Sequence, residues 1–133
     1  MSKTTILDND QITMWYHPEK KIIHHQMHKY VFGPKFREFL LKGVDVMRQR
    51  GADKWLSDDR LNPVLKPEDN QWAMTEWAPM VMKAGWKYWA IVQPEHLIAK
   101  LRMETNAKAF ADMGLTVQLF SDPDEALKWL ESV

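Results

Sequence analysis

The chain has 133 residues, a hydrophobic fraction of 45%, and 18 basic against 18 acidic side chains. This length suits one domain with a single core, and the balanced, interspersed charges argue against nucleic acid as a partner. There is no cysteine, which excludes disulfides, thiolate metal sites and a cysteine nucleophile.

Two features of composition bear on location and binding. No apolar run reaches the roughly 18 residues that cross a bilayer, and the opening MSKTTILDND lacks the apolar stretch of a secretory signal. We therefore expect a cytoplasmic protein with no membrane span. The seven tryptophans and nine methionines are many for this length. Such side chains fill cores, which is the commoner case, or form adaptable apolar binding surfaces.

The first half of the chain predicts a hairpin, a helix and a strand. Residues 11–16 (QITMWY) and 22–29 (IIHHQMHK) are β-prone and are separated by the turn-like HPEKK. Apolar residues then recur at helical spacing from Phe36 to Met47, and Gly51 ends that helix. Residues 52–57 (ADKWLS) predict a short strand that runs into a polar loop.

The second half predicts two strands and three helices. Pro67 begins a helix that Gly85 ends, and Pro79 should kink or divide it because proline removes a backbone donor. Residues 87–93 (KYWAIVQ) and 115–120 (LTVQLF) predict strands, with a helix over 97–113 between them. Asp122 is placed as the N-cap of a last helix that runs to the end.

This order predicts an α/β fold over 1–133, in which an N-terminal hairpin precedes right-handed strand-helix units. The sheet is expected to be mixed, mostly parallel and five-stranded, with the last four strands parallel. Crossovers of one hand place their helices on one face of such a sheet, so we expect the opposite face to be uncovered. Aromatic residues there, such as Trp15, favour a twofold homodimer.

Three stretches support a family resemblance. They are the aspartate-rich strand end WLSDDR (55–60), the helix with Trp72 and Trp77, and the closing FSDPDEALKWL (120–130). Together with the element order, they resemble the SpoIIAA-like fold of STAS domains and of a large group of small bacterial STAS-like proteins. The resemblance covers nearly the whole chain and implies a single SpoIIAA-like domain.

The resemblance also draws attention to Ser57. In the anti-sigma-factor antagonists of this fold, a D-S-S-G-like turn follows the strand after the first helix, and a partner kinase phosphorylates its serine. The matching stretch here is Ser57-Asp58-Asp59-Arg60, which departs from that pattern because it has no glycine and one serine. A turn or capping role for Ser57 is the simpler alternative.

The same loop is the main candidate for a site, because α/β proteins place binding groups at the carboxyl ends of parallel strands. Residues Ser57, Asp58, Asp59 and Arg60 could bind a polar ligand or perform acid-base work. Alternatively, Arg60 and an aspartate only anchor the turn. Trp72 and Trp77, with neighbouring methionines, could line an apolar pocket nearby, although Trp77 shares a helical face with core residues.

The histidines do not predict a metal site. His24, His25 and His28 lie in one strand, but alternation points His25 away from the other two, and no H-E-x-x-H or similar pattern occurs. We interpret them as part of a solvated sheet face. Phosphate-loop and dinucleotide glycine patterns are also missing from the sequence, so it predicts no cofactor and assigns no catalytic residue.

We interpret the chain as a noncatalytic STAS-like module that binds a protein partner or a small apolar ligand through the strand-exit loops and the tryptophan helix. The alternative is a small hydrolase or isomerase that uses Asp58, Asp59 and His96. That activity would require the three side chains to converge in a concave site. A deep pocket lined by Asp58 and His96 would favour the enzyme, and a shallow or purely apolar one would favour the module.

Overall fold

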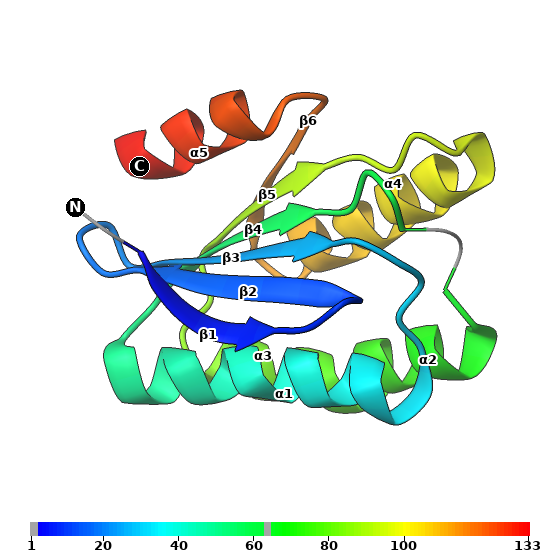
Figure 1. Cartoon of the computed structure of the whole chain (residues 1–133), viewed down its shortest axis with the longest axis horizontal. Coiled ribbons are helices and arrows are strands. Elements are labelled where there is room, and N and C mark those ends of the chain that lie inside the picture. The colour runs from blue at the N-terminus through cyan, green and yellow to red at the C-terminus, as the bar shows by residue number, and fades with distance from the viewer. Residues whose placement is uncertain (1–2, 63–64) are drawn as a thin grey trace.

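The computed structural model describes residues 3–62 and 65–133 and contains one six-stranded sheet (Figure 1). The strands lie side by side in chain order, as follows: β1 Thr4–Asp8, β2 Ile12–His17, β3 Ile22–Met27, β4 Lys54–Asp58, β5 Tyr88–Val92 and β6 Thr116–Phe120. β1, β2 and β3 are antiparallel, and β3 to β6 are parallel. The predicted α/β class, mixed sheet and four parallel strands are therefore confirmed. No helix of the described chain is long and apolar enough to cross a membrane.

The predicted number of five strands is wrong, because β1 adds a sixth at the edge of the sheet. This strand pairs with β2 through a tight connection in which Asn9 Oδ1 accepts the backbone N–H groups of Gln11 and Ile12, at 2.8 and 3.0 Å. Its residues are exposed or half-buried, so it carries little of the apolar alternation that identifies a strand in a sequence.

The crossover helices share one face of the sheet, as predicted. They are α1 Gly33–Arg50, the continuous run α2 Pro67–Trp72, η1 Ala73–Trp77 and α3 Ala78–Lys83, and α4 Leu97–Asp112. The backbone stays helical through the middle run, and the predicted kink or division at Pro79 takes the form of a change in helix type, with a π-helical turn directly before α3 and Pro79 in the first turn of α3. Asp69 ties α2 to the start of α1, since its Oδ2 accepts the Gly33 N–H at 2.9 Å.

The core on this face is built around tryptophan. Trp55, Trp77 and Trp86 pack with ring centroids 5.6 to 5.7 Å apart, and each is at most 5% exposed. Gly43 of α1 lies directly against the Trp55 ring, where a Cβ atom would overlap ring carbons. The helix can approach the sheet this closely only because residue 43 has no side chain.

The expectation that the second face is uncovered is wrong for half of the sheet. Helix α5, Pro123–Ser132, lies across β4, β5 and β6 on the side opposite to α1 (Figure 1), and it buries Ala126 and Leu130 against Leu56 and Ala90. This helix follows the last strand and makes no crossover, so the handedness rule does not fix its face.

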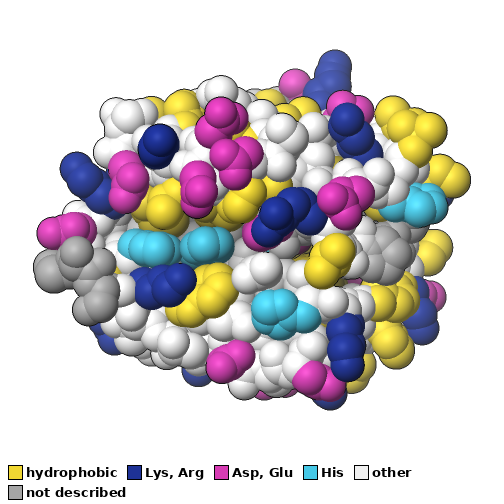
Figure 2. Space-filling model, turned by 45° about the horizontal axis from the view of Figure 1, so that its top comes forward, with side chains coloured by type: hydrophobic (Ala, Val, Ile, Leu, Met, Phe, Trp, Pro, Cys, Tyr) yellow, Lys and Arg dark blue, Asp and Glu magenta, His cyan; other side chains and the backbone are white. Residues whose placement is uncertain are grey.

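The remaining part of the second face belongs to β2 and β3 and carries Trp15, His17, His24 and Gln26, all half-buried. Figure 2, turned toward this side, shows hydrophobic and histidine side chains among charged ones. A homodimer through this face stays a prediction, with a smaller surface than the sequence suggested.

Candidate functional site

A small cavity of about 70 Å³ lies between the sheet and its crossover helices, near the carboxyl ends of β3 and β4. It adjoins a wider hollow of about 250 Å³ between α2 and α4. Asn62, Leu65, Asn70, Met103 and Asn106 line both spaces. We call the smaller space the inner chamber and the wider one the outer chamber. A site in this position agrees with the general placement of ligands in α/β proteins.

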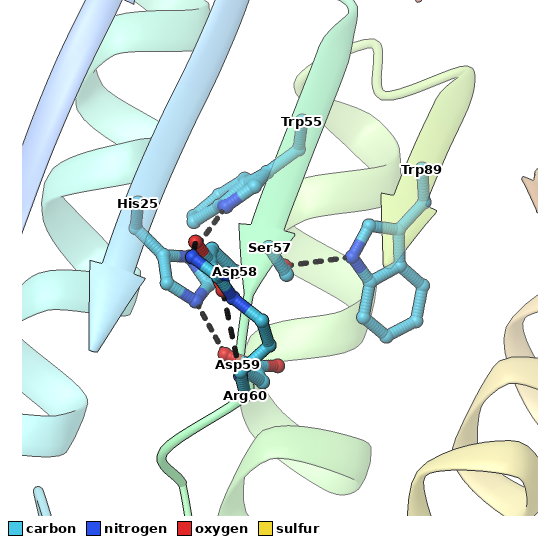
Figure 3. A network of polar contacts seen from close by, with 7 residues as sticks. All are labelled: His25, Trp55, Ser57, Asp58, Asp59, Arg60 and Trp89. Carbon is cyan, nitrogen blue, oxygen red and sulfur yellow. Dashed lines mark hydrogen bonds and ion pairs between the residues drawn. The ribbon is translucent and has the colours of Figure 1, made fainter. Parts of the chain in front are cut away.

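A buried polar chain borders the inner chamber (Figure 3). The Trp55 indole N–H donates to His25 Nδ1 at 2.9 Å, and His25 Nε2 lies 2.7 Å from Asp59 Oδ1. Because an indole nitrogen only donates, His25 Nδ1 must be the acceptor and the imidazole proton sits on Nε2, facing Asp59. The three residues are 1 to 3% exposed. His25 is therefore held as a neutral tautomer with both nitrogens engaged.

Strand alternation brings these groups together. His25 and Trp55 point to the helix side of β3 and β4, while His24 and Leu56 point to the α5 side. Asp59 follows β4 directly, and its backbone N–H donates to Val92 O at 3.1 Å, which fixes the start of the loop against β5. The Asp59 carboxyl group is thereby placed near the carboxyl end of β3, within hydrogen-bond distance of His25.

Ser57 also faces the inner chamber and is 3% exposed. Its Oγ accepts the Trp89 indole N–H at 2.8 Å. A kinase needs an exposed hydroxyl, so this position argues against Ser57 as a phosphorylation site in the folded protein. The hydroxyl proton remains available to a ligand.

The walls of the inner chamber are mainly aromatic, and their rings come from Phe36, Phe39, Trp55, Trp77, Trp86, Trp89 and Phe110. All four indole N–H groups already donate within the protein, those of Trp77 and Trp86 to the backbone oxygens of Leu40 and Tyr88. The tryptophans therefore offer a ligand only their ring faces and edges.

Amide side chains stand where the two chambers meet. Asn106 Nδ2 donates to Asn70 Oδ1 at 2.9 Å, which joins α4 to α2. Asn62 is 4% exposed, and its buried Oδ1 finds no hydrogen-bond partner in the part of the chain that the structure describes. A buried acceptor left without a donor costs about 1 to 3 kcal/mol. The outer chamber adds Thr105 and the exposed Arg102 to this polar rim.

The predicted site residues are divided between different parts of the molecule. Asp58 points to the α5 side of β4 and binds Arg60 through two contacts, Nε to Oδ1 at 2.9 Å and Nη2 to Oδ2 at 2.8 Å. The hydrogen bond to Asp58 raises the pKa of Arg60. Ser57 and Asp59 border the inner chamber, whereas the exposed His96 stands before α4.

The two tryptophans of the middle helix also differ. Trp77 is 5% exposed and lines the inner chamber as part of the core. Trp72 is half-buried outside it, with the Arg37 guanidinium 5.3 Å from its ring centroid. The pocket that forms is neither lined by Asp58 and His96 nor purely apolar, so it matches neither of the two outcomes set out from the sequence.

Two residues of the site were missed in the sequence. His25 was assigned to a solvated face together with His24 and His28, which is wrong for His25 because it is buried on the helix side. The available signal was the strand alternation, which points His25 to the opposite face from His24 and His28. Asn62 lies in a loop, and no local pattern marks it. Among the described residues, no group of three His, Asp or Glu side chains could hold a metal ion.

Compared with known proteins, the chain matches no family model, no curated protein and no solved structure.

Proposed function

We propose that this protein is a noncatalytic binding module that holds a small, largely apolar ligand in the inner and outer chambers. The observation that carries the proposal is the buried Asn62 Oδ1, which has no partner among the described residues and lies where two spaces share their lining. Interiors are normally close-packed, and buried polar atoms normally find partners. A ligand that fills the space and donates to Asn62 would satisfy both requirements.

The resemblance to STAS-like proteins is part of this proposal, with a ligand rather than a kinase as the partner. The buried state of Ser57 favours that choice, because a kinase or a protein partner could reach it only after local opening. The bound ligand would contact aromatic walls in the inner chamber and amide groups at the rim, which is the usual composition of a small-molecule site.

The alternative of a hydrolase or isomerase finds less support in the geometry. Asp58 and Asp59 lie on opposite sides of β4, and His96 is exposed at the start of α4. His25 is the histidine in the cavity, but both of its nitrogens already take part in hydrogen bonds. It therefore has no free nitrogen with which to accept a proton from a substrate.

Native mass spectrometry of protein purified gently from cells tests the proposal. We expect a species heavier than the 15.7 kDa chain by the mass of one small molecule. Replacing Met103, which lines both chambers, by tryptophan should block the space and remove the added mass. Lys108→Trp on the exposed side of the same helix is the matched control and should keep it.

Two results would contradict the proposal. One is a bare chain in every gentle preparation, with no small molecule taken up from a cell extract. The other is an added mass that Met103→Trp retains in full, because the ligand would then lie elsewhere.

A further inference from the structure

The inner chamber offers two side-chain acceptors to a ligand, the carboxylate of Asp59 and the amide oxygen of Asn62. Asn62 Oδ1 is buried, and no residue in 3–62 or 65–133 donates to it. Asp59 Oδ1 is bound by His25, and within the described residues Asp59 Oδ2 receives no hydrogen bond. On the donor side, the indole and imidazole N–H groups are used inside the protein, and the Ser57 hydroxyl and amide N–H groups of the lining asparagines remain. Asp59 is the acidic side chain in the described lining, so a matching ligand brings a donor to its carboxylate.

The charge of the chamber points in the same direction. The Trp55 N–H can only donate to an unprotonated His25 Nδ1, so the imidazole stays neutral and does not cancel the negative charge of Asp59. The walls around this carboxylate are aromatic ring faces, which attract cations through their quadrupoles. A cation at this place would gain a charge-assisted hydrogen bond and cation-π contacts together.

The dimensions limit the body of the ligand. The inner chamber of about 70 Å³ admits an amine head and a few carbons, and the remainder must extend into the outer chamber of about 250 Å³. We propose that the ligand is a slim primary amine whose ammonium group is held by Asp59 and Asn62, and whose apolar chain runs toward the rim. This inference rests on the proposed function and names the chemical class of its ligand.

Three probes of equal length test it: n-hexylamine, 1-hexanol and hexanoate. Binding is followed at neutral pH through the indole ¹H–¹⁵N resonances, with those of Trp15 and Trp129 on the other face as internal references. Hexylamine is expected to bind about tenfold more tightly than 1-hexanol, since hydrogen bonds to an ionised group are about twice as strong as neutral ones. Hexanoate is expected to bind most weakly.

Two isosteric substitutions, at the neighbouring residues Asp58 and Asp59, show which carboxylate accounts for the preference for the amine. Asp59→Asn should reduce the preference for hexylamine over 1-hexanol to within about twofold, while 1-hexanol binding persists as evidence of an intact fold. Asp58→Asn on the opposite side of β4 should leave the preference unchanged. If Asp59→Asn does not fold, Asn62→Asp serves instead, and its second carboxylate should raise the preference several-fold.

The outcomes distinguish this inference from the function on which it rests. If 1-hexanol binds as tightly as hexylamine or more tightly, or if hexanoate binds most tightly near Arg102, the ligand is not an amine. The proposed ligand-binding function would still stand. Unmoved indole resonances with all three probes overturn both. A preference for hexylamine that survives Asp59→Asn would also refute the assignment of the ammonium to Asp59.

Discussion

The histidine pair His17 and His24 makes the free energy of unfolding depend on pH in the acidic range. On the half-covered face of β2 and β3, His17 Nε2 lies 3.2 Å from His24 Nδ1, and the His24 ring packs beside Trp15 with centroids 4.8 Å apart. Burial lowers the pKa of His24 to about 3, and the positive charges of His17 and Lys3 act in the same direction. The folded protein therefore keeps His24 neutral at pH values where an unfolded histidine takes up a proton.

The size of the effect follows from this difference in pKa. An unfolded histidine has a pKa near 6.5, so the contribution of neutral His24 to stability is complete above about pH 6.5. It is lost progressively as the pH falls toward 3, because only the unfolded chain then gains the proton. At pH 5 the loss is about 2 kcal/mol, from 1.4 kcal/mol for each unit between 6.5 and 5.

Urea unfolding of the wild type and of His24→Gln at pH 7 and pH 5 measures this. Glutamine is neutral at both pH values and can still hydrogen-bond with His17. Between pH 7 and pH 5, the free energy of unfolding of the wild type should fall by about 2 kcal/mol more than that of the variant. Comparing the two proteins removes the acid titration of the other groups that they share. Equal losses would show that His24 is not held neutral.

Three further substitutions test the packing. Gly43→Ala should lower the free energy of unfolding by about 1 to 3 kcal/mol, because the added Cβ would overlap the Trp55 ring. The loss should be smaller in a Trp55→Phe background, where the ring is smaller. An unchanged urea midpoint would contradict the close approach of α1 to Trp55. Asp122→Ala should cost about 1 kcal/mol by removing the acceptor for the Asp124 N–H, now seen at 3.2 Å, whereas Asp122→Asn, which keeps the cap, should cost less. Trp129→Ala should lower the free energy of unfolding by about 2 kcal/mol, because the half-buried ring packs on Phe120. This is less than the loss for a fully buried tryptophan. A loss near zero in thermal unfolding would mean that Trp129 does not anchor α5 to the sheet.

Local signals predicted most of the elements. The apolar spacing of α1 and the glycine after it are confirmed, with Gly51 in the left-handed region at φ 70° and its N–H on Met47 O. The N-cap at Asp122 is confirmed as well. These features depend on residues close together in the sequence, and this is why a single sequence could indicate them.

The missed features depend on contacts between distant residues. β1 is an exposed edge whose pairing with β2 leaves little apolar pattern, and the face that α5 covers is chosen by its packing on Leu56 and Ala90. The inner chamber forms where strands β3, β4 and β5, the loop after β4, and helices from separate parts of the chain meet. No local pattern shows that His25 and Asp59, 34 positions apart, lie within hydrogen-bond distance.

The central claim is that a space for a ligand exists between the sheet and helices α2 and α4. A crystal structure determined under xenon pressure tests it most directly, because xenon binds in empty space against apolar side chains, and the walls of the inner chamber are mainly aromatic. We predict xenon density in the inner chamber near Trp89 and Phe110, absent in Met103→Trp and present in Lys108→Trp. A wild-type structure with no xenon there, and with the aromatic rings packed against one another and no space between them, would contradict the account.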